Sequence, residues 1–223
     1  MEFILFEKLA ELSAKEWVLL AVAAALSAAL IVILVRMAKK HREQSSAAPA
    51  KRIPTRVLVQ GALCLSVAFV LSYIKLFSLP MGGSVTLFSM LPVVLFGYLY
   101  GPAYGFTAAL AFSLLQLIQD PYIIHPVQYA LDYLLAFTAL GLGSLFPKSL
   151  PLGVAVSGFA RLVCSVISGV VFFSEYAAEA GYSSALWYSV AYNGSTIGIE
   201  TVLCVIAAAL PVVARTTERI RAK

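Results

Sequence analysis

Residues 150–173 read LPLGVAVSGFARLVCSVISGVVFF, an apolar run that a single charge, Arg161, interrupts. A run of this length and composition is typical of a helix that crosses a lipid bilayer, which needs about 20 mostly apolar residues. The whole chain has the same character, since 61% of its 223 residues are hydrophobic, 12% are charged and the mean hydropathy is +0.91. This composition excludes a water-soluble globular protein and predicts an all-α integral membrane protein.

Six further apolar segments surround this run. The first, residues 17–35, is uncharged and has no small-residue cleavage site before the basic residues that follow it, so it predicts a membrane span and not a signal peptide. The others follow a hydrophilic linker, and they are residues 57–76, 86–100, 103–118, 126–146 and 186–213. We therefore expect a six-helix bundle preceded by one extra N-terminal transmembrane helix.

Basic residues divide the chain and indicate its orientation. The predicted regions are an extra-cytoplasmic segment with the additional helix (1–37), a basic cytoplasmic linker (38–54), the six-helix domain (55–214) and a basic cytoplasmic tail (215–223). Lys and Arg concentrate in the cytoplasmic loops of membrane proteins, and Lys148 falls on the same predicted side as the linker and the tail. Seven spans in the plasma membrane, with the N-terminus outside and the C-terminus inside, satisfy this pattern.

Several functions are excluded at this stage. The net charge of +5 does not indicate nucleic-acid binding, because the cations adjoin apolar segments, where they set topology and contact lipid headgroups. The three cysteines lack CxxC spacing and predict neither disulfides nor a zinc site. Since the sequence contains no H-E-x-x-H motif and no facing pair of aspartates, we expect no enzyme, no catalytic residue, no metal and no cofactor.

Three ionisable residues lie well within the predicted spans: Asp132, Arg161 and Glu200. Burying each costs about 2.5–3.5 kcal/mol, so each needs a partner or a function. Positions three and four apart share one face of a helix, and on this spacing each of the three belongs to a polar stripe. The stripes are His125, Gln128, Tyr129, Asp132 and Tyr133; Ser157, Arg161, Cys164, Ser165 and Ser168; and Tyr188, Ser189, Tyr192, Asn193, Thr196 and Glu200.

If the three stripes face one another, they form a pocket that opens to the outside, with Arg161 below it. Tyrosine rings would stack on an aromatic solute and attract a cation. Asp132 would supply countercharge or accept a hydrogen bond from an exocyclic amine, and Asn193 would supply a donor and an acceptor together. Arg161 could pair with either Asp132 or Glu200, and the sequence does not choose between them.

Short motifs from Ser78 onward give a more specific indication. In chain order they are LPMGGSVTL (79–87), SMLP (89–92), YGP (100–102), SLLQ (113–116), HPVQYALDY (125–133), ISGVVFFSEYA (167–177) and YSVAYNG (188–194). In these motifs the chain resembles the thiamine-specific substrate-binding subunits, or S components, of the energy-coupling-factor (ECF) vitamin transporters. The resemblance covers most of residues 55–214.

The resemblance implies a high-affinity subunit that captures thiamine from outside and delivers it inward. A membrane coupling subunit and two cytoplasmic ATPases would be its partners. Asp132 would contact the aminopyrimidine or counter the charge of thiamine, with Arg161 close by. The substrate-binding residues expected from the stripes and the resemblance together are Asp132, Tyr133, Asn193, Tyr188, Arg161, Tyr129, Ser165 and His125. Ser165 and Phe173 depart from the histidine and tryptophan expected of some relatives.

The resemblance also implies a contact with the coupling subunit through small residues of the first bundle helix, for which Ala62, Ser66 and Ala68 are the candidates. The sequence contains no nucleotide-binding motif, so the energy for transport must come from a partner or from an ion gradient. An alternative therefore stays open: a self-sufficient, proton-coupled transporter of thiamine or a thiamine precursor, working through Asp132, Arg161 and Glu200.

Overall fold

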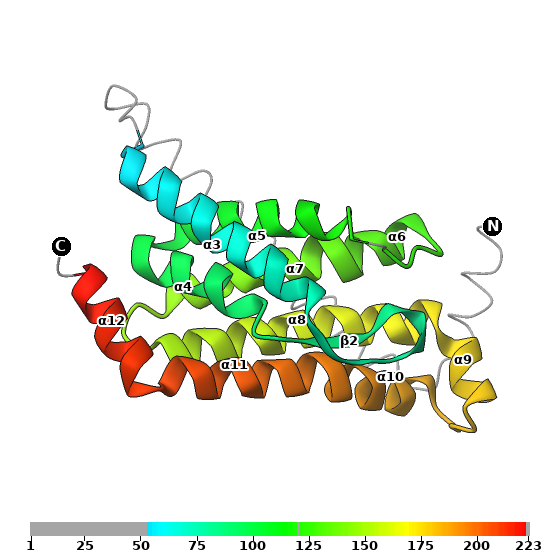
Figure 1. Ribbon diagram of the computed structural model, residues 1–223. Helices are drawn as coiled ribbons and strands as arrows, with labels where there is room; N and C mark the ends of the chain where they lie inside the picture. Colours follow the sequence, from blue (N-terminus) through cyan, green and yellow to red (C-terminus); the bar gives the residue numbers. More distant parts are fainter. Residues whose placement is uncertain (1–52, 120, 222–223) are drawn as a thin grey trace.

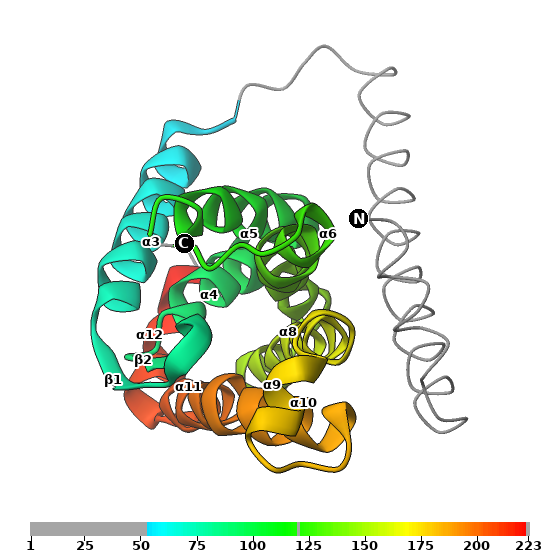
Figure 2. The same ribbon diagram turned by 90° about the vertical axis from the view of Figure 1, so that its right-hand side faces the viewer.

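The computed structural model of the protein describes residues 53–119 and 121–221. Within these residues the chain forms a bundle of helices that pack side by side, with a short hairpin across one end (Figures 1 and 2). The predicted extra span at residues 17–35, and the linker up to residue 52, lie outside the described residues.

Each of the six bundle segments predicted from hydropathy is helical, which confirms the all-α fold. Among the residues that the structure describes, three helical stretches are long and apolar enough to cross a membrane: Thr55–Tyr73, Leu150–Phe172 and Ala185–Ala209. The helices are α3 (Thr55–Tyr73), α4 (Met90–Tyr100), α5 (Pro102–Gln116), α6 (Pro126–Tyr129), η2 (Ala130–Leu135), α7 (Ala136–Thr138), η3 (Ala139–Leu145), α8 (Leu150–Phe172), α9 (Ser174–Glu179), α10 (Ala185–Asn193), η4 (Gly194–Gly198), α11 (Ile199–Ala209) and α12 (Pro211–Arg221).

The turn between α4 and α5 consists of Gly101 alone. Its positive φ of 91° suits a residue without a Cβ, and its N–H donates to the carbonyl of Gly97 over 2.8 Å. Pro102 then begins α5, where a missing N–H costs no hydrogen bond. The two helices approach closely, because a Cβ added at Gly97 would lie 2.8 Å from the Cα of Gly105.

A two-stranded antiparallel hairpin between α3 and α4 was not predicted. It consists of β1 (Lys75–Ser78) and β2 (Ser84–Thr86), joined by a turn that contains η1 (Pro80–Gly82). The hydropathy of residues 57–76 and 86–100 predicted unbroken helices here. Those predicted ends were wrong, because α3 stops at Tyr73 and α4 begins only at Met90.

The last predicted span is also interrupted. Leu210 has an extended backbone (ψ 134°), and Pro211 starts α12 in a new direction, so the helix changes course before residue 213 (Figure 1). The predicted boundary between domain and tail at residue 215 therefore falls inside α12. Arg221 fastens this helix to the bundle, since its Nη1 donates to the carbonyl of Pro147 over 2.6 Å and its guanidinium lies 4.7 Å from the ring centroid of Tyr98.

The core lies where α4, α5, η3 and α8 meet. Phe112 and Phe137 pack edge to face there, with ring centroids 5.6 Å apart, beside the buried Met90 and Leu140. Large apolar side chains also cover the outside of the bundle, among them Leu63 and six others that are at least half exposed: Leu58, Val59, Val70, Tyr73, Phe159 and Val202. A lipid bilayer would solvate such a surface, which water would not.

Candidate ligand pocket

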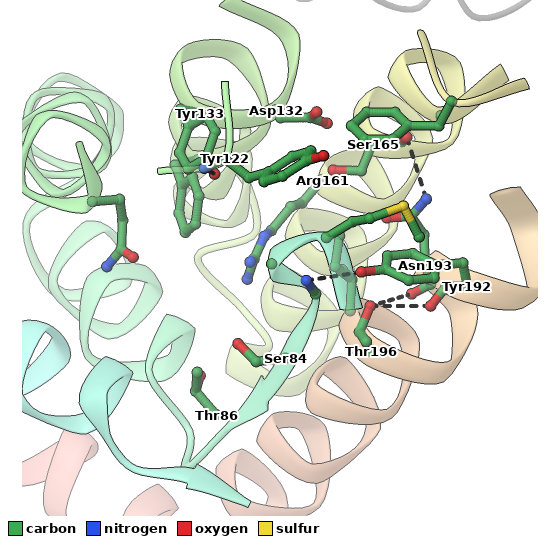
Figure 3. Close-up of a pocket in the computed structure, with 18 of the residues that line it drawn as sticks. Ser84, Thr86, Tyr122, Asp132, Tyr133, Arg161, Ser165, Tyr192, Asn193 and Thr196 are labelled. Carbon is green, nitrogen blue, oxygen red and sulfur yellow. Dashed lines mark hydrogen bonds between the residues drawn. The ribbon is translucent and has the colours of Figure 1, made fainter. Parts of the chain in front are cut away.

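A pocket opens at the end of the bundle that carries the hairpin, and its cavity measures about 190 Å³. It is lined by residues from the end of α3, the hairpin and the start of α4, the end of α5 and the connection that follows it, the segment Pro126–Leu145, α8, and the α10–η4 stretch. Figure 3 shows side chains from these parts converging on one space, among them Asp132, Tyr133, Ser165 and Asn193. The prediction that three polar stripes face one another is therefore confirmed for these residues.

Asp132 lies in the π-helical turn η2, a form that is rare in proteins and frequent at functional sites. Its Oδ2 accepts hydrogen bonds from Gln128 Nε2 over 2.8 Å and from Ser168 Oγ over 2.7 Å. Both donors belong to the predicted stripes, and both are neutral. Within residues 53–119 and 121–221, no cation forms an ion pair with this carboxylate.

Arg161 pairs with Glu200, which decides between the two partners that the sequence left open. Arg161 Nη1 lies 3.4 Å from Glu200 Oε2, and the guanidinium also covers the ring of Phe137 at 4.3 Å from its centroid. The other carboxylate oxygen of Glu200 accepts from the hydroxyls of Thr86 and Ser89, the latter over 2.8 Å. The ion pair thus joins α8 and α11 to the start of α4 beneath the pocket.

Tyrosine rings form the aromatic part of the lining. The hydroxyl of Tyr133 accepts from the backbone N–H of Tyr122 over 2.8 Å, which fixes the Tyr133 ring against the chain that leads into α6. On the opposite side, the rings of Tyr188 and Tyr192 lie 6.0 Å apart in a tilted arrangement. Tyr133, Tyr188 and Tyr192 all line the cavity, and aromatic rings are the groups on which an aromatic ligand stacks.

Asn193 and Ser165 connect α10 to α8 at the pocket wall. The side-chain amide of Asn193 donates to the carbonyl of Ser165 over 3.3 Å and to the carbonyl of Ser189 over 3.0 Å. Ser189 in turn donates to the carbonyl of Val166 over 2.9 Å. These bonds orient the Asn193 amide between two helices that both line the pocket.

Tyr192 belongs to a predicted stripe, but its main contact was not predicted. Its hydroxyl accepts from the N–H of Gly83 over 2.9 Å and donates to the carbonyl of Pro80. It therefore joins α10 to the turn of the hairpin. Only the three-dimensional fold brings these residues together, since they are 109 positions apart.

An aromatic group lies where the chain crosses the open end of the pocket. The hydroxyls of Tyr122 and Tyr176 are 3.0 Å apart, and the ring of Phe173 packs against both. The hydrogen bond with Tyr122 raises the pKa of Tyr176, which lies on α9 outside the spans. Phe173 and Tyr122 line the cavity, and Phe173 is one of the two positions where the sequence departs from some relatives.

Two predicted binding residues do not line the pocket. His125 stacks on Phe172, with ring centroids 5.1 Å apart, and its Nδ1 accepts from the N–H of Val127. Tyr129 packs against Tyr133 in a tilted arrangement, with ring centroids 6.0 Å apart. Helical spacing put both on the stripe of Asp132, but His125 precedes the first residue of α6, and the π-helical turn after Tyr129 shifts the face that later residues present. A role of these two residues in binding stays a prediction, and the lining of the cavity does not include them.

Sequence reasoning also missed part of the lining. The hairpin, the end of α5 and the chain before α6 contribute residues that no stripe contained: Met81, Ser84, Thr86, Gln116, Gln119 and Tyr122. A signal was available for some of them, because the motifs at 79–87 and 113–116 contain four of the six. Because the hairpin was not predicted, the sequence did not indicate that these motifs reach the pocket.

The small residues of α3 do not form one surface. Ala62 and Ser66 are exposed, whereas Ala68 is completely buried and packs in the core with Met90 and Phe112. Ala68 was predicted to contact a partner, and that prediction is wrong because its side chain faces α4 and α5. Ala62 and Ser66 stay accessible.

Comparison with known proteins gives a consistent result. The sequence pattern of the thiamine transporter protein family (Thia_YuaJ) matches residues 58–220. The chain is 30% identical over 169 residues to the thiamine transporter ThiT of Bacillus subtilis, a match that covers 67% of this chain and 86% of that protein. Its fold is similar to the solved structure of ThiT from Listeria monocytogenes, with a TM-score of 0.63 and 24% identity over 75% of this chain and 97% of the other.

Proposed function

Since the chain belongs to the thiamine transporter protein family, we propose that its pocket binds thiamine and that it serves as the substrate-binding subunit of an uptake system. It is a membrane protein and not an enzyme. The observation that carries the proposal is the meeting of Asp132 and Tyr133 from η2 with Tyr188 and Asn193 from α10 in one cavity. This set combines a carboxylate, an amide and aromatic faces, which is the chemistry that an aromatic cation with an amino group needs.

Each group has a proposed role towards thiamine. The carboxylate of Asp132 accepts from the exocyclic amine of the aminopyrimidine or balances the charge of the thiazolium ring. Tyr133 and Tyr188 stack against the rings, and Asn193 makes a polar contact. Ser165 supports Asn193 through its carbonyl, and Arg161 lies deeper, next to the ring of Phe137.

We also propose that the pocket faces the outside of the cell. The ends of the helices opposite the pocket carry Arg56, Lys148 and three arginines of α12: Arg215, Arg219 and Arg221. Cytoplasmic ends of membrane proteins are enriched in such cations. In this orientation, with seven spans in all and the N-terminus outside, the pocket would capture thiamine from the exterior.

Release to the inside needs energy, and an ECF module of one membrane coupling subunit and two ATPases is the proposed source. Ala62 and Ser66 on the exposed side of α3 are the proposed contact with the coupling subunit, because small residues allow close helix packing. The ion pair of Arg161 with Glu200 favours this reading over proton coupling, since both charges are compensated.

Calorimetric titration of the detergent-purified protein with thiamine tests the binding step. Fluorescence of Trp187 is less suitable, because its side chain is 66% exposed and does not line the cavity. We expect saturable binding at submicromolar thiamine, and absence of binding up to millimolar thiamine would contradict the proposal.

Uptake into proteoliposomes tests the energy source. We expect thiamine accumulation only when the coupling subunit and its ATPases are reconstituted together with this chain and supplied with ATP. Accumulation by the chain alone, driven by a proton gradient and abolished by a protonophore, would overturn the ECF assignment and support the proton-coupled alternative.

A further inference from the structure

Glu200 is a buried carboxylate that touches the pocket only through other residues. Its side chain is 1% exposed and is absent from the lining of the cavity. Its contacts are Arg161 on one oxygen and the hydroxyls of Thr86 and Ser89 on the other. All three partners act as hydrogen-bond donors to the carboxylate, which accepts through both of its oxygens.

Three charged side chains of the described residues line the cavity. Asp132 and Arg161 line it from the inside, and Lys75 lines it from the exposed strand β1, where water screens its charge. Arg161 Nη1 lies 3.4 Å from Glu200 Oε2, whereas Gln128 and Ser168, which donate hydrogen bonds to Asp132, are neutral. The interior of the pocket therefore keeps one uncompensated negative charge.

We propose that Glu200 is a positioning residue that determines the charge selectivity of the pocket. By pairing with Arg161, it cancels a cation that would otherwise repel a positively charged ligand and attract Asp132. The inference rests on the proposed function, in which the ligand is the thiamine cation, and it adds a role for a residue that does not touch the ligand. Thr86 and Ser89 hold Glu200 in the geometry that this requires.

The expected effect follows from electrostatics. Two unit charges about 10 Å apart at an effective dielectric constant of about 20 interact strongly enough to change an equilibrium constant on the order of tenfold. Replacing Glu200 with Gln keeps the size of the side chain and one acceptor oxygen, but it removes the charge and leaves Arg161 without an anionic partner. A cationic ligand should then lose affinity, whereas a neutral ligand of the same shape should not.

The test compares thiamine with 3-deazathiamine, an isostere in which an uncharged thiophene replaces the thiazolium ring. The affinities of both are measured by calorimetry for the wild-type protein, for Glu200→Gln and for the double variant Arg161→Gln/Glu200→Gln. Glu218→Gln, which changes an exposed carboxylate on α12, is the matched control. Melting temperature in detergent shows whether each variant is folded.

We expect the preference for thiamine over its neutral isostere to fall about tenfold or more in Glu200→Gln and to return to within about threefold of wild type in the double variant. An equal loss for both ligands would overturn the inference and assign Glu200 a purely structural role, as would an unchanged preference. If the wild-type protein bound neither ligand, the proposed function itself would fail. Normal thiamine binding by wild type with an unchanged preference in Glu200→Gln would reject this inference alone.

Discussion

The hydroxyl of Tyr192 accepts a hydrogen bond of 2.9 Å from the N–H of Gly83, so a residue near the end of α10 holds the turn of the hairpin at the pocket. The same hydroxyl donates to the carbonyl of Pro80. Two backbone groups of the turn thus depend on one side chain. The position of the hairpin and the shape of the pocket are coupled through this contact.

Tyr192→Phe removes the hydroxyl and keeps the ring that packs against Tyr188. We expect thiamine to dissociate several-fold faster, because loss of one or two hydrogen bonds corresponds to about 1–2 kcal/mol. Stopped-flow displacement with excess unlabelled ligand measures this rate. Tyr182→Phe, which removes a hydroxyl from a ring outside the cavity, is the control, and equal dissociation rates in both variants would refute the role of the contact.

Asn193→Ala should weaken thiamine binding by about 1–3 kcal/mol. The substitution removes a pocket amide and leaves the carbonyl of Ser165 without the bond that Asn193 provides. Isothermal titration gives the affinity. Ser195→Ala is the control, since its hydroxyl bonds the carbonyl of Tyr192 outside the cavity, and a loss of the same size there would show that the effect is a general loosening of η4.

Ala68→Leu and Ala62→Leu should have different consequences, although both lie on α3. Ala68 is completely buried, so a larger side chain should destabilise the protein by about 1–3 kcal/mol and lower its melting temperature in detergent. A wild-type melting temperature would contradict the packing described for α3 against α4 and α5.

Ala62→Leu should leave thiamine affinity unchanged and reduce uptake in proteoliposomes that contain the coupling module. The exposed methyl group of Ala62 lies where close packing of a partner helix would exclude a leucine. Val70→Leu, at another exposed position of α3, is the control. Full uptake by Ala62→Leu would remove this face from the proposed interface.

Gly97→Ala should destabilise the contact between α4 and α5, because the added Cβ would lie 2.8 Å from the Cα of Gly105 and 3.0 Å from the Cβ of Ser144. We expect a loss of about 1–3 kcal/mol, read as a lower melting temperature. Gly198→Ala is the matched control, since nothing lies within 4 Å of a Cβ at that position. Similar melting temperatures for the two variants would contradict the close approach.

The helical segments were predictable because each is a continuous apolar run. The turn at Gly101 was predictable because a glycine followed by a proline is typical of a helix end and a new helix start. The hairpin was not, since Lys75–Ser78 and Ser84–Thr86 are too short to show an alternating pattern and adjoin apolar helices. The prediction from hydropathy therefore placed the ends of the neighbouring helices inside the hairpin. The bend at Leu210 was missed for a related reason, because the apolar run continues across Pro211.

In the pocket, helical spacing correctly grouped Asp132 with Gln128, and Ser165 with Ser168, because side chains four and three apart share a face. It failed for Tyr129 because η2 is wound as a π-helix, which changes the number of residues per turn. The pairing of Arg161 with Glu200 could not be chosen from the sequence, since it depends on how α8 and α11 are packed. Tyr122 lines the cavity from the connection between α5 and α6. Helical or strand periodicity in the sequence cannot predict the path of such an irregular connection.

The most direct test of the central claim compares the thiamine affinity of the wild-type protein with that of Asp132→Asn, with the exposed Glu179→Gln as control. The asparagine can still accept from Gln128 and Ser168, so the comparison isolates the negative charge. We predict that Asp132→Asn binds about 1–3 kcal/mol more weakly, a loss of about tenfold to a hundredfold, while the control is unchanged. Wild-type affinity in Asp132→Asn would contradict the assignment of this pocket as the thiamine site.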